Sequence, residues 1–136
     1  MDADIFTLCD GAYNYNGKLT IVGSYEQIVI RNYPQLFKSS LAVRIIFTPQ
    51  DVTDESILVV NYLDYQENVI GNSRFKLPKP PMEAKHFSLA LALNQDLNIS
   101  AGDVIKIQMV LNDKIIKVKE IPIKVIDANP DKNKND

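Results

Sequence analysis

The stretch KHFSLALALN, residues 85–94, decides the fold class. Successive side chains of an extended chain point to opposite faces, so every second residue of this stretch shares a face. From Phe87 onward one face carries large apolar side chains, namely Phe87, Leu89, Leu91 and Leu93. Apolar spacing of three and four residues is not sustained in the chain, so the pattern predicts β-strands rather than helices.

Two more stretches have strand patterns. Leu41, Val43, Ile45 and Phe47 alternate in the same way, and Pro49 ends that run because proline cannot donate to a ladder. Ile57-Leu58-Val59-Val60 is apolar at every position. Such a run is typical of a strand inside a sheet or covered by a neighbouring segment.

The strongest turn signal is Asn16-Gly17, because a two-residue hairpin loop of type I′ needs positive φ at both positions. It predicts a hairpin in which Tyr15 faces Lys18 and Ala12 faces Ile21. Before Gly23 the apolar residues are at odd-numbered positions, Leu19 and Ile21, and after it they are at even-numbered positions, Ile28 and Ile30. This change of face predicts a bulge or bend at Gly23.

A second two-residue turn is predicted at Asn112-Asp113. Its register places Leu111 opposite Lys114, Met109 opposite Ile116, Gln108 opposite Lys117, Ile107 opposite Val118 and Lys106 opposite Lys119. In this register Met109 and Ile107 face apolar residues and Gln108 faces a polar one. The like charges of Lys106 and Lys119 are the exception, which we interpret as a solvated face. A further parity change predicts an extra residue near Lys119-Glu120.

The length of 136 residues suits one domain, and an apolar content of 46% with 24% charged residues is ordinary for a globular protein. About eight short strands in such a chain predict a two-layer antiparallel β-sandwich, immunoglobulin-like or similar. We assign it residues 1–126. Residues 127–136 are nearly free of apolar side chains, which predicts a disordered polar tail.

Composition also ranks the partners. The net charge is −2, and proteins that bind nucleic acids usually carry an excess of basic residues, so no nucleic-acid partner is expected. No apolar stretch approaches the ~20 residues that span a bilayer, so no membrane is expected. The chain starts without a secretory leader pattern and holds one cysteine, Cys9, which together favour the cytoplasm.

Several segments together resemble a known family. These are Cys9-Asp10-Gly11-Ala12, the run from Gly17 to Gly23, Pro34, and Gly102-Asp103 before a closing hairpin. Over roughly residues 5–126 the chain is similar to a widespread bacterial family of small proteins classified as a domain of unknown function. The resemblance implies bacterial origin and a β-sandwich. It brings no activity, cofactor or site residues.

Catalytic residues are scarce in this sequence. Cys9 and His86 are the one possible thiol and imidazole pair, and a nucleophilic cysteine would need the histidine within hydrogen-bond reach. The competing interpretation is a buried core cysteine and a solvent-facing histidine, which we favour. No phosphate loop, dinucleotide fingerprint or nucleophile elbow is present, so neither an enzyme nor a cofactor is predicted.

A hard cation is a second possibility. Asp51, Asp54 and Glu55 share one loop, and carboxylate oxygens are the ligands that Ca²⁺ prefers. Their spacing matches no EF-hand, and acidic residues are common in solvated turns.

Tyrosines are the remaining candidates, because a large apolar face with a polar tip is enriched at interfaces. The candidate binding residues are Tyr13, Tyr15, Tyr62 and Tyr65; the alternative is that they only reflect strand propensity and partial burial. The leading hypothesis is a non-catalytic interaction or structural module that binds a protein partner or its own copy. A small-ligand or calcium-binding sandwich is the alternative, and a cysteine-dependent hydrolase ranks third.

Overall fold

The computed structural model describes residues 1–53, 55–81, 83, 85 and 87–126 of the chain. Nine strands form in this part: β1 (Asp2–Tyr15), β2 (Lys18–Tyr25), β3 (Ile28–Ile30), β4 (Gln35–Phe47), β5 (Ile57–Leu63), β6 (Val69–Lys76), β7 (Phe87–Ile99), β8 (Val104–Leu111) and β9 (Lys114–Val125). A single 3₁₀ turn, η1 (Pro49–Asp51), follows β4. The all-β prediction is confirmed. The predicted polar tail lies outside the described residues.

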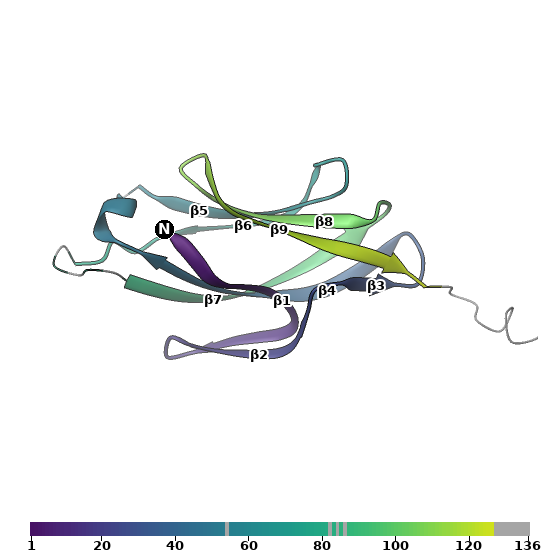
Figure 1. Cartoon of the computed structure of the whole chain (residues 1–136), viewed down its shortest axis with the longest axis horizontal. Coiled ribbons are helices and arrows are strands. Elements are labelled where there is room, and N and C mark those ends of the chain that lie inside the picture. The colour runs from purple at the N-terminus through teal and green to yellow at the C-terminus, as the bar shows by residue number, and fades with distance from the viewer. Residues whose placement is uncertain (54, 82, 84, 86, 127–136) are drawn as a thin grey trace, which may run out of the picture.

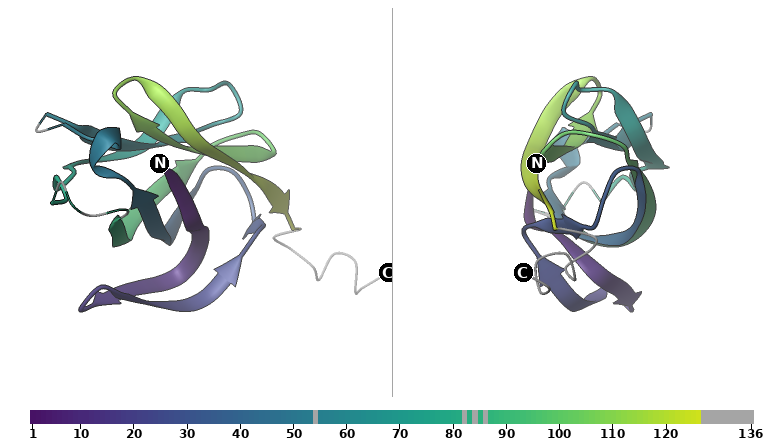
Figure 2. Two further views of the ribbon diagram at one scale, coloured as in Figure 1. Left: turned by 60° about the vertical axis from the view of Figure 1, so that its left-hand side comes forward. Right: turned by 90° about the vertical axis from the view of Figure 1, so that its right-hand side faces the viewer.

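The strands form two sheets. The order is β2-β1-β4-β7 in the four-stranded sheet and β3-β9-β8-β5-β6 in the five-stranded one. Figure 1 shows β5, β6 and β8 as one layer above β1, β4 and β7, and Figure 2 shows how strongly the strands curl. Strand pairing is antiparallel except between β3 and β9, which run parallel and so depart from the prediction of antiparallel strands alone. Within the described residues, no helix is long and apolar enough to cross a bilayer.

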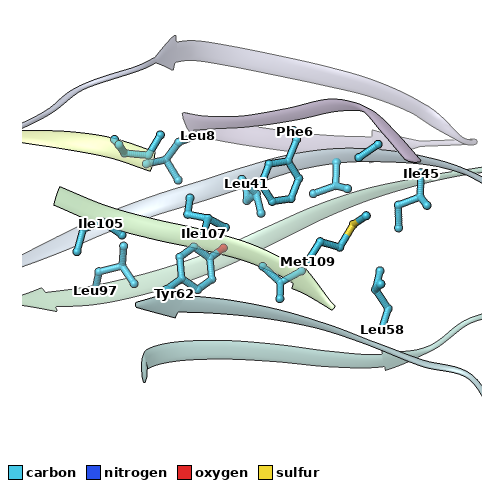
Figure 3. Packing of buried hydrophobic residues seen from close by; sticks show 14 of the residues in the cluster. Phe6, Leu8, Leu41, Ile45, Leu58, Tyr62, Leu97, Ile105, Ile107 and Met109 are labelled. Atoms are coloured by element: carbon cyan, nitrogen blue, oxygen red, sulfur yellow. The ribbon is translucent and has the colours of Figure 1, made fainter. Parts of the chain in front are cut away.

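The core draws buried side chains from both sheets (Figure 3). Leu41, Val43 and Ile45 on β4 have no exposed surface, as their alternation predicts. The alternating leucines of β7 are half-buried and pack against the same cluster. The continuous apolar run lies on β5, which is an inner strand between β8 and β6, also as predicted.

The first hairpin has the predicted register, with Tyr15 opposite Lys18 and Ala12 opposite Ile21. Asn16 and Gly17 both have positive φ, at 51° and 79°. The pairing register does not shift at Gly23, so the predicted bulge is absent and the position is a bend with φ of 64°. The apolar parity changes further along because the chain leaves one sheet after β2 and enters the other at β3.

We define the hairpin arm as residues 10–25, the end of β1 together with β2. Figure 1 shows β2 outside the layer of β1, β4 and β7. Asn14 Nδ2 donates to the Ala90 carbonyl of β7 at 2.8 Å, although β7 is not a neighbour of β1 in the sheet. Leu19 and Ile21 of the arm pack against a small buried cluster of Cys9, Ala12 and Ala42. Small side chains on the outer face of β4 therefore leave room for the arm.

The second hairpin has the predicted turn but a different register. Leu111 lies opposite Lys114, whereas Met109 lies opposite Lys117 rather than Ile116. The predicted pairs of Gln108 with Lys117, Ile107 with Val118 and Lys106 with Lys119 are therefore wrong as well. The extra residue lies next to the turn and not near Lys119-Glu120. This shift places Lys106 opposite Glu120, which replaces a repulsive pair of like charges by an attractive one.

The same shift turns two lysines of β9 toward β1. Lys117 Nζ donates to the Ala3 carbonyl at 2.8 Å, and Lys119 Nζ donates to the Phe6 carbonyl at 3.3 Å. β2 pairs with β1 only from Leu8 onward in the described residues, so this earlier edge of β1 has no strand beside it. Ammonium groups thus satisfy carbonyls that a neighbouring strand would otherwise use.

Candidate functional site

Three loops meet at one end of the molecule, on the right in Figure 1. We define the loop end as residues 31–34 between β3 and β4, residues 64–68 between β5 and β6, and residues 100–103 between β7 and β8. The loops belong to both sheets, so only the folded chain brings them together. They carry two half-exposed tyrosines, Tyr33 and Tyr65.

Both tyrosines contact Gly102. The Tyr33 hydroxyl donates to the Gly102 carbonyl. A Cβ added to Gly102 would lie 2.4 Å from Cδ1 of Tyr65, so the Tyr65 ring lies directly on the glycine backbone. The φ of +89° at Gly102 is a second reason why glycine is needed at this position. Both tyrosines are therefore positioned by the same turn.

Polar contacts fix the loop of Tyr65. Asp64 Oδ1 accepts hydrogen bonds from the backbone N–H groups of Gln66 and Asn68, each at 2.9 Å. Glu67 Oε1 lies 2.7 Å from Lys106 Nζ, and this hydrogen bond holds the pKa of the Glu67 carboxyl below its usual value. Both partners are partly or fully exposed, so the pair orients the loop more than it stabilises the fold.

The exposed faces of the rings give this end its chemical character. Tyr65 is 47% exposed and Tyr33 is 39% exposed. A tyrosine already held in one position loses little conformational entropy when it is buried by a partner. The arrangement can bind an apolar or mixed surface and has no adjacent nucleophile and base among the described residues.

The tyrosines predicted from sequence divide into three places. Tyr13 and Tyr15 lie on the hairpin arm and are exposed, whereas Tyr65 lies at the loop end. Tyr62 is wrong as a binding candidate, because its side chain is completely buried in the core (Figure 3). Burial raises the pKa of its hydroxyl. Alternation could have shown this, since Tyr62 shares a face with Leu58 and Val60.

Tyr33 was not among the binding candidates chosen from the sequence. The sequence places it in a loop next to Pro34, with no periodicity to mark it. Its contact is with Gly102, which is far along the chain, so no local pattern reports it. The one signal available in the sequence was Gly102, a glycine in a short turn before a strand, which marks a place where another group can approach the backbone closely.

Cys9 lies in the small cluster beneath the hairpin arm. Its thiol donates to the Ser40 carbonyl at 3.5 Å, and burial raises the pKa of the thiol. A protonated and buried thiol is a poor nucleophile. His86 lies outside the described residues, so the predicted pair with Cys9 stays a prediction.

The predicted acidic loop follows β4. Asp51 Oδ2 accepts from the backbone N–H of Thr48 at 2.7 Å and from its hydroxyl at 3.1 Å. Those hydrogen bonds, the backbone one first, hold the pKa of Asp51 below its usual value. Glu55 is exposed, and Asp54 lies outside the described residues. Within the described ranges, no three His, Cys, Asp or Glu side chains gather closely enough to hold a metal ion.

A comparison with protein families matches residues 4–126, which include both the hairpin arm and the loop end. This chain belongs to a family of unknown function, DUF6941. The resemblance noted from the sequence is confirmed in this respect, while bacterial origin stays a prediction. Among curated proteins, no sequence matches the chain. The family assigns no residue a role, so the functional interpretation depends on geometry.

Proposed function

We propose that this protein is a non-catalytic interaction module that binds a protein partner through its loop end. The proposal takes the two sheets as an immunoglobulin-like β-sandwich scaffold in a bacterial cytoplasm. The observation that carries it is the pair of half-exposed tyrosines that both contact Gly102. Loops presented by a rigid sheet framework are where many domains bind.

Three features support a protein rather than a small molecule as the ligand. The tyrosines come from two separate loops, one of which crosses between the sheets, and lie on an open end, which suits a broad contact. Tyrosine is enriched at the centres of protein interfaces. A tyrosine that is already held in place loses little conformational entropy on binding. Surrounding exposed polar groups, including Arg31 and Gln66, fit the polar rim of such an interface.

The test compares two double variants of the full chain. The variant Tyr33→Ala with Tyr65→Ala removes both rings of the loop end, and Tyr13→Ala with Tyr15→Ala removes two exposed rings of the hairpin arm. Each is used as bait in its native host, and the captured protein is then purified and titrated by calorimetry.

The loop-end variant should lose affinity by about thirtyfold or more, the size expected when an interface hot spot is truncated. The arm variant should bind the partner as the wild type does. Equal affinities for all three proteins, each shown to be folded by circular dichroism, would exclude the loop end as the binding surface. A wild type that captures no specific partner contradicts the proposal itself.

A further inference from the structure

β2 is a strand with one unused edge. It lies at the end of the four-stranded sheet and pairs only with β1 among the described residues. It is eight residues long and contains no proline. Val22, near its middle, is 52% exposed. Open edges of this kind can pair with another strand unless something covers them.

The register with β1 shows which backbone groups of β2 are unpaired. Tyr15 and Lys18 flank a two-residue loop, so they form a hydrogen-bonded pair, and hydrogen-bonded pairs recur at every second residue. Lys18, Thr20, Val22 and Ser24 therefore direct their N–H and C=O groups toward β1. By the same count the groups of Leu19, Ile21, Gly23 and Tyr25 face the free edge, with Gly23 departing from extended geometry at a φ of 64°.

We propose that two copies of this chain pair antiparallel through the β2 edges, with Val22 of each copy at the two-fold axis. In this register Ile21 of one copy lies opposite Gly23 of the other, and Leu19 lies opposite Tyr25. All four belong to the set with unpaired backbone groups, so the hydrogen-bonding parity is satisfied. The inference goes beyond the proposed function, since it concerns a different surface and a different partner.

Charge selects this register from others of the same parity. Here Lys18 of each copy lies opposite Glu26 of the other, and both residues are exposed. Opposite charges across a ladder attract, and the two-fold axis doubles the contact. Moving the copy by two residues along the strand would leave Lys18 opposite Ser24 and Glu26 beyond the paired segment.

Tyr13 completes the contact. It lies opposite Thr20 on the exposed face of the arm and is 60% exposed. Its ring reaches along β1 to Gly11, where its hydroxyl is 3.2 Å from the position that a Cβ would take. Because Gly11 lies opposite Val22, each valine at the axis has a tyrosine ring beside it. The paired arms would thus bury an apolar patch contributed by both copies.

Such an interface is small, so the dimer should be weak, with a dissociation constant on the order of tens of micromolar. The first test is disulfide trapping of the full chain. A non-hydrogen-bonded antiparallel pair has Cα atoms about 4.5 Å apart, within the range that a disulfide can bridge. Val22→Cys should therefore form a covalent dimer under mild oxidation.

The matched control is Thr20→Cys, which lies on the same exposed face but faces Ser24 of the other copy in this register. It should form at least tenfold less covalent dimer than Val22→Cys. The native Cys9 is buried and should take no part. Equal trapping of the two variants, or none by either, would overturn the proposed register.

The second test uses charge reversal and sedimentation equilibrium. Lys18→Glu and Glu26→Lys should each weaken self-association by about tenfold, because like charges then face each other twice. An equimolar mixture of the two variants restores both ion pairs and should associate as the wild type does. Failure of the mixture to associate, or a wild type that stays monomeric to several hundred micromolar, overturns the inference.

The outcome is separable from that of the proposed function. The loop-end variant with Tyr33→Ala and Tyr65→Ala should dimerise normally. If the wild type is monomeric but still binds a partner through the loop end, the proposed dimer is ruled out and the proposed function is not.

Discussion

Gly102 fixes two aromatic rings with one backbone turn. The Tyr33 hydroxyl bonds to its carbonyl and the Tyr65 ring occupies the space where a side chain would start. Substitution therefore meets two obstacles at once, a steric one and the conformational cost of positive φ. Gly17 also has positive φ, at 79°, but a Cβ there would meet nothing within 4 Å.

This contrast gives a prediction for a pair of variants. Gly17→Ala should cost about 1 kcal/mol of unfolding free energy from backbone strain alone. Gly102→Ala should cost about 2–3 kcal/mol, because the Tyr65 ring must also move. Urea denaturation of both variants measures the difference. Equal losses would mean that Tyr65 does not rest on the glycine.

Asp51 predicts a dependence of stability on pH. Its carboxylate accepts two hydrogen bonds from Thr48, which lower its pKa in the folded state below the ordinary value of 3.8. A depressed folded pKa stabilises the fold above that ordinary value, and the contribution disappears as the pH falls through the folded pKa. Asp51→Asn should therefore be less stable than the wild type at pH 7, and the difference should shrink below about pH 4. Thermal melts across this range test it, and a constant difference would contradict the assignment.

At the scale of elements, the hairpin arm depends on small residues beneath it. Ala42 is fully buried and contacts the cluster that holds Leu19 and Ile21 in place. The arm approaches β4 closely only because this side chain is a methyl group. A larger side chain must either displace the arm or distort β4.

We expect Ala42→Leu to destabilise the protein by about 1–3 kcal/mol, as overpacking does. Amide exchange should accelerate in β2, whereas β8 should keep its protection. Val59→Leu, which adds one carbon rather than three on the half-exposed face of β5, serves as a control away from the arm. Unchanged exchange in β2 would show that the arm does not rest on β4.

Local patterns predicted much at this scale. Alternation located β4 and β7, and Asn-Gly located the first hairpin with its register, because both signals depend on neighbouring residues. The second hairpin shows the limit. Its extra residue lies next to the turn, where apolar Ile115 and Ile116 make two registers look equally good along the sequence. Pairing Lys106 with Glu120 decides between them, and that choice needs both strands in view.

The arrangement of the whole molecule could not be predicted from such patterns. Tyr33, Tyr65 and Gly102 are distant in sequence and meet only because the loops of two sheets share one end. The same holds for the contact between Asn14 and Ala90, which connects β1 to a strand that is not its neighbour. The one local signal that separates the buried Tyr62 from the exposed Tyr65 is the alternation along β5, which places Tyr62 on the core face and ends before Tyr65.

Topology also predicts the folding kinetics. β1 pairs with β4, β4 with β7 and β5 with β8, so most ladders join segments that are distant along the chain. Closing such loops is slow because chain entropy is lost before the contacts form. Refolding from urea should therefore take milliseconds to seconds rather than microseconds. Stopped-flow fluorescence of the tyrosines measures this, and a submillisecond phase with full amplitude would contradict it.

The crossing between the two sheets has a further consequence. β2 ends at Tyr25 and β3 begins at Ile28, so two residues join the hairpin arm to the strand that leads directly into the loop of Tyr33. Three extended Cα steps from Tyr25 to Ile28 span only about 10 Å, so the arm cannot shift far without altering the strain on that loop. The two binding equilibria are then linked. If dimerisation through β2 changes the affinity for a partner at Tyr33 by some factor, binding of that partner must change the affinity of dimerisation by the same factor.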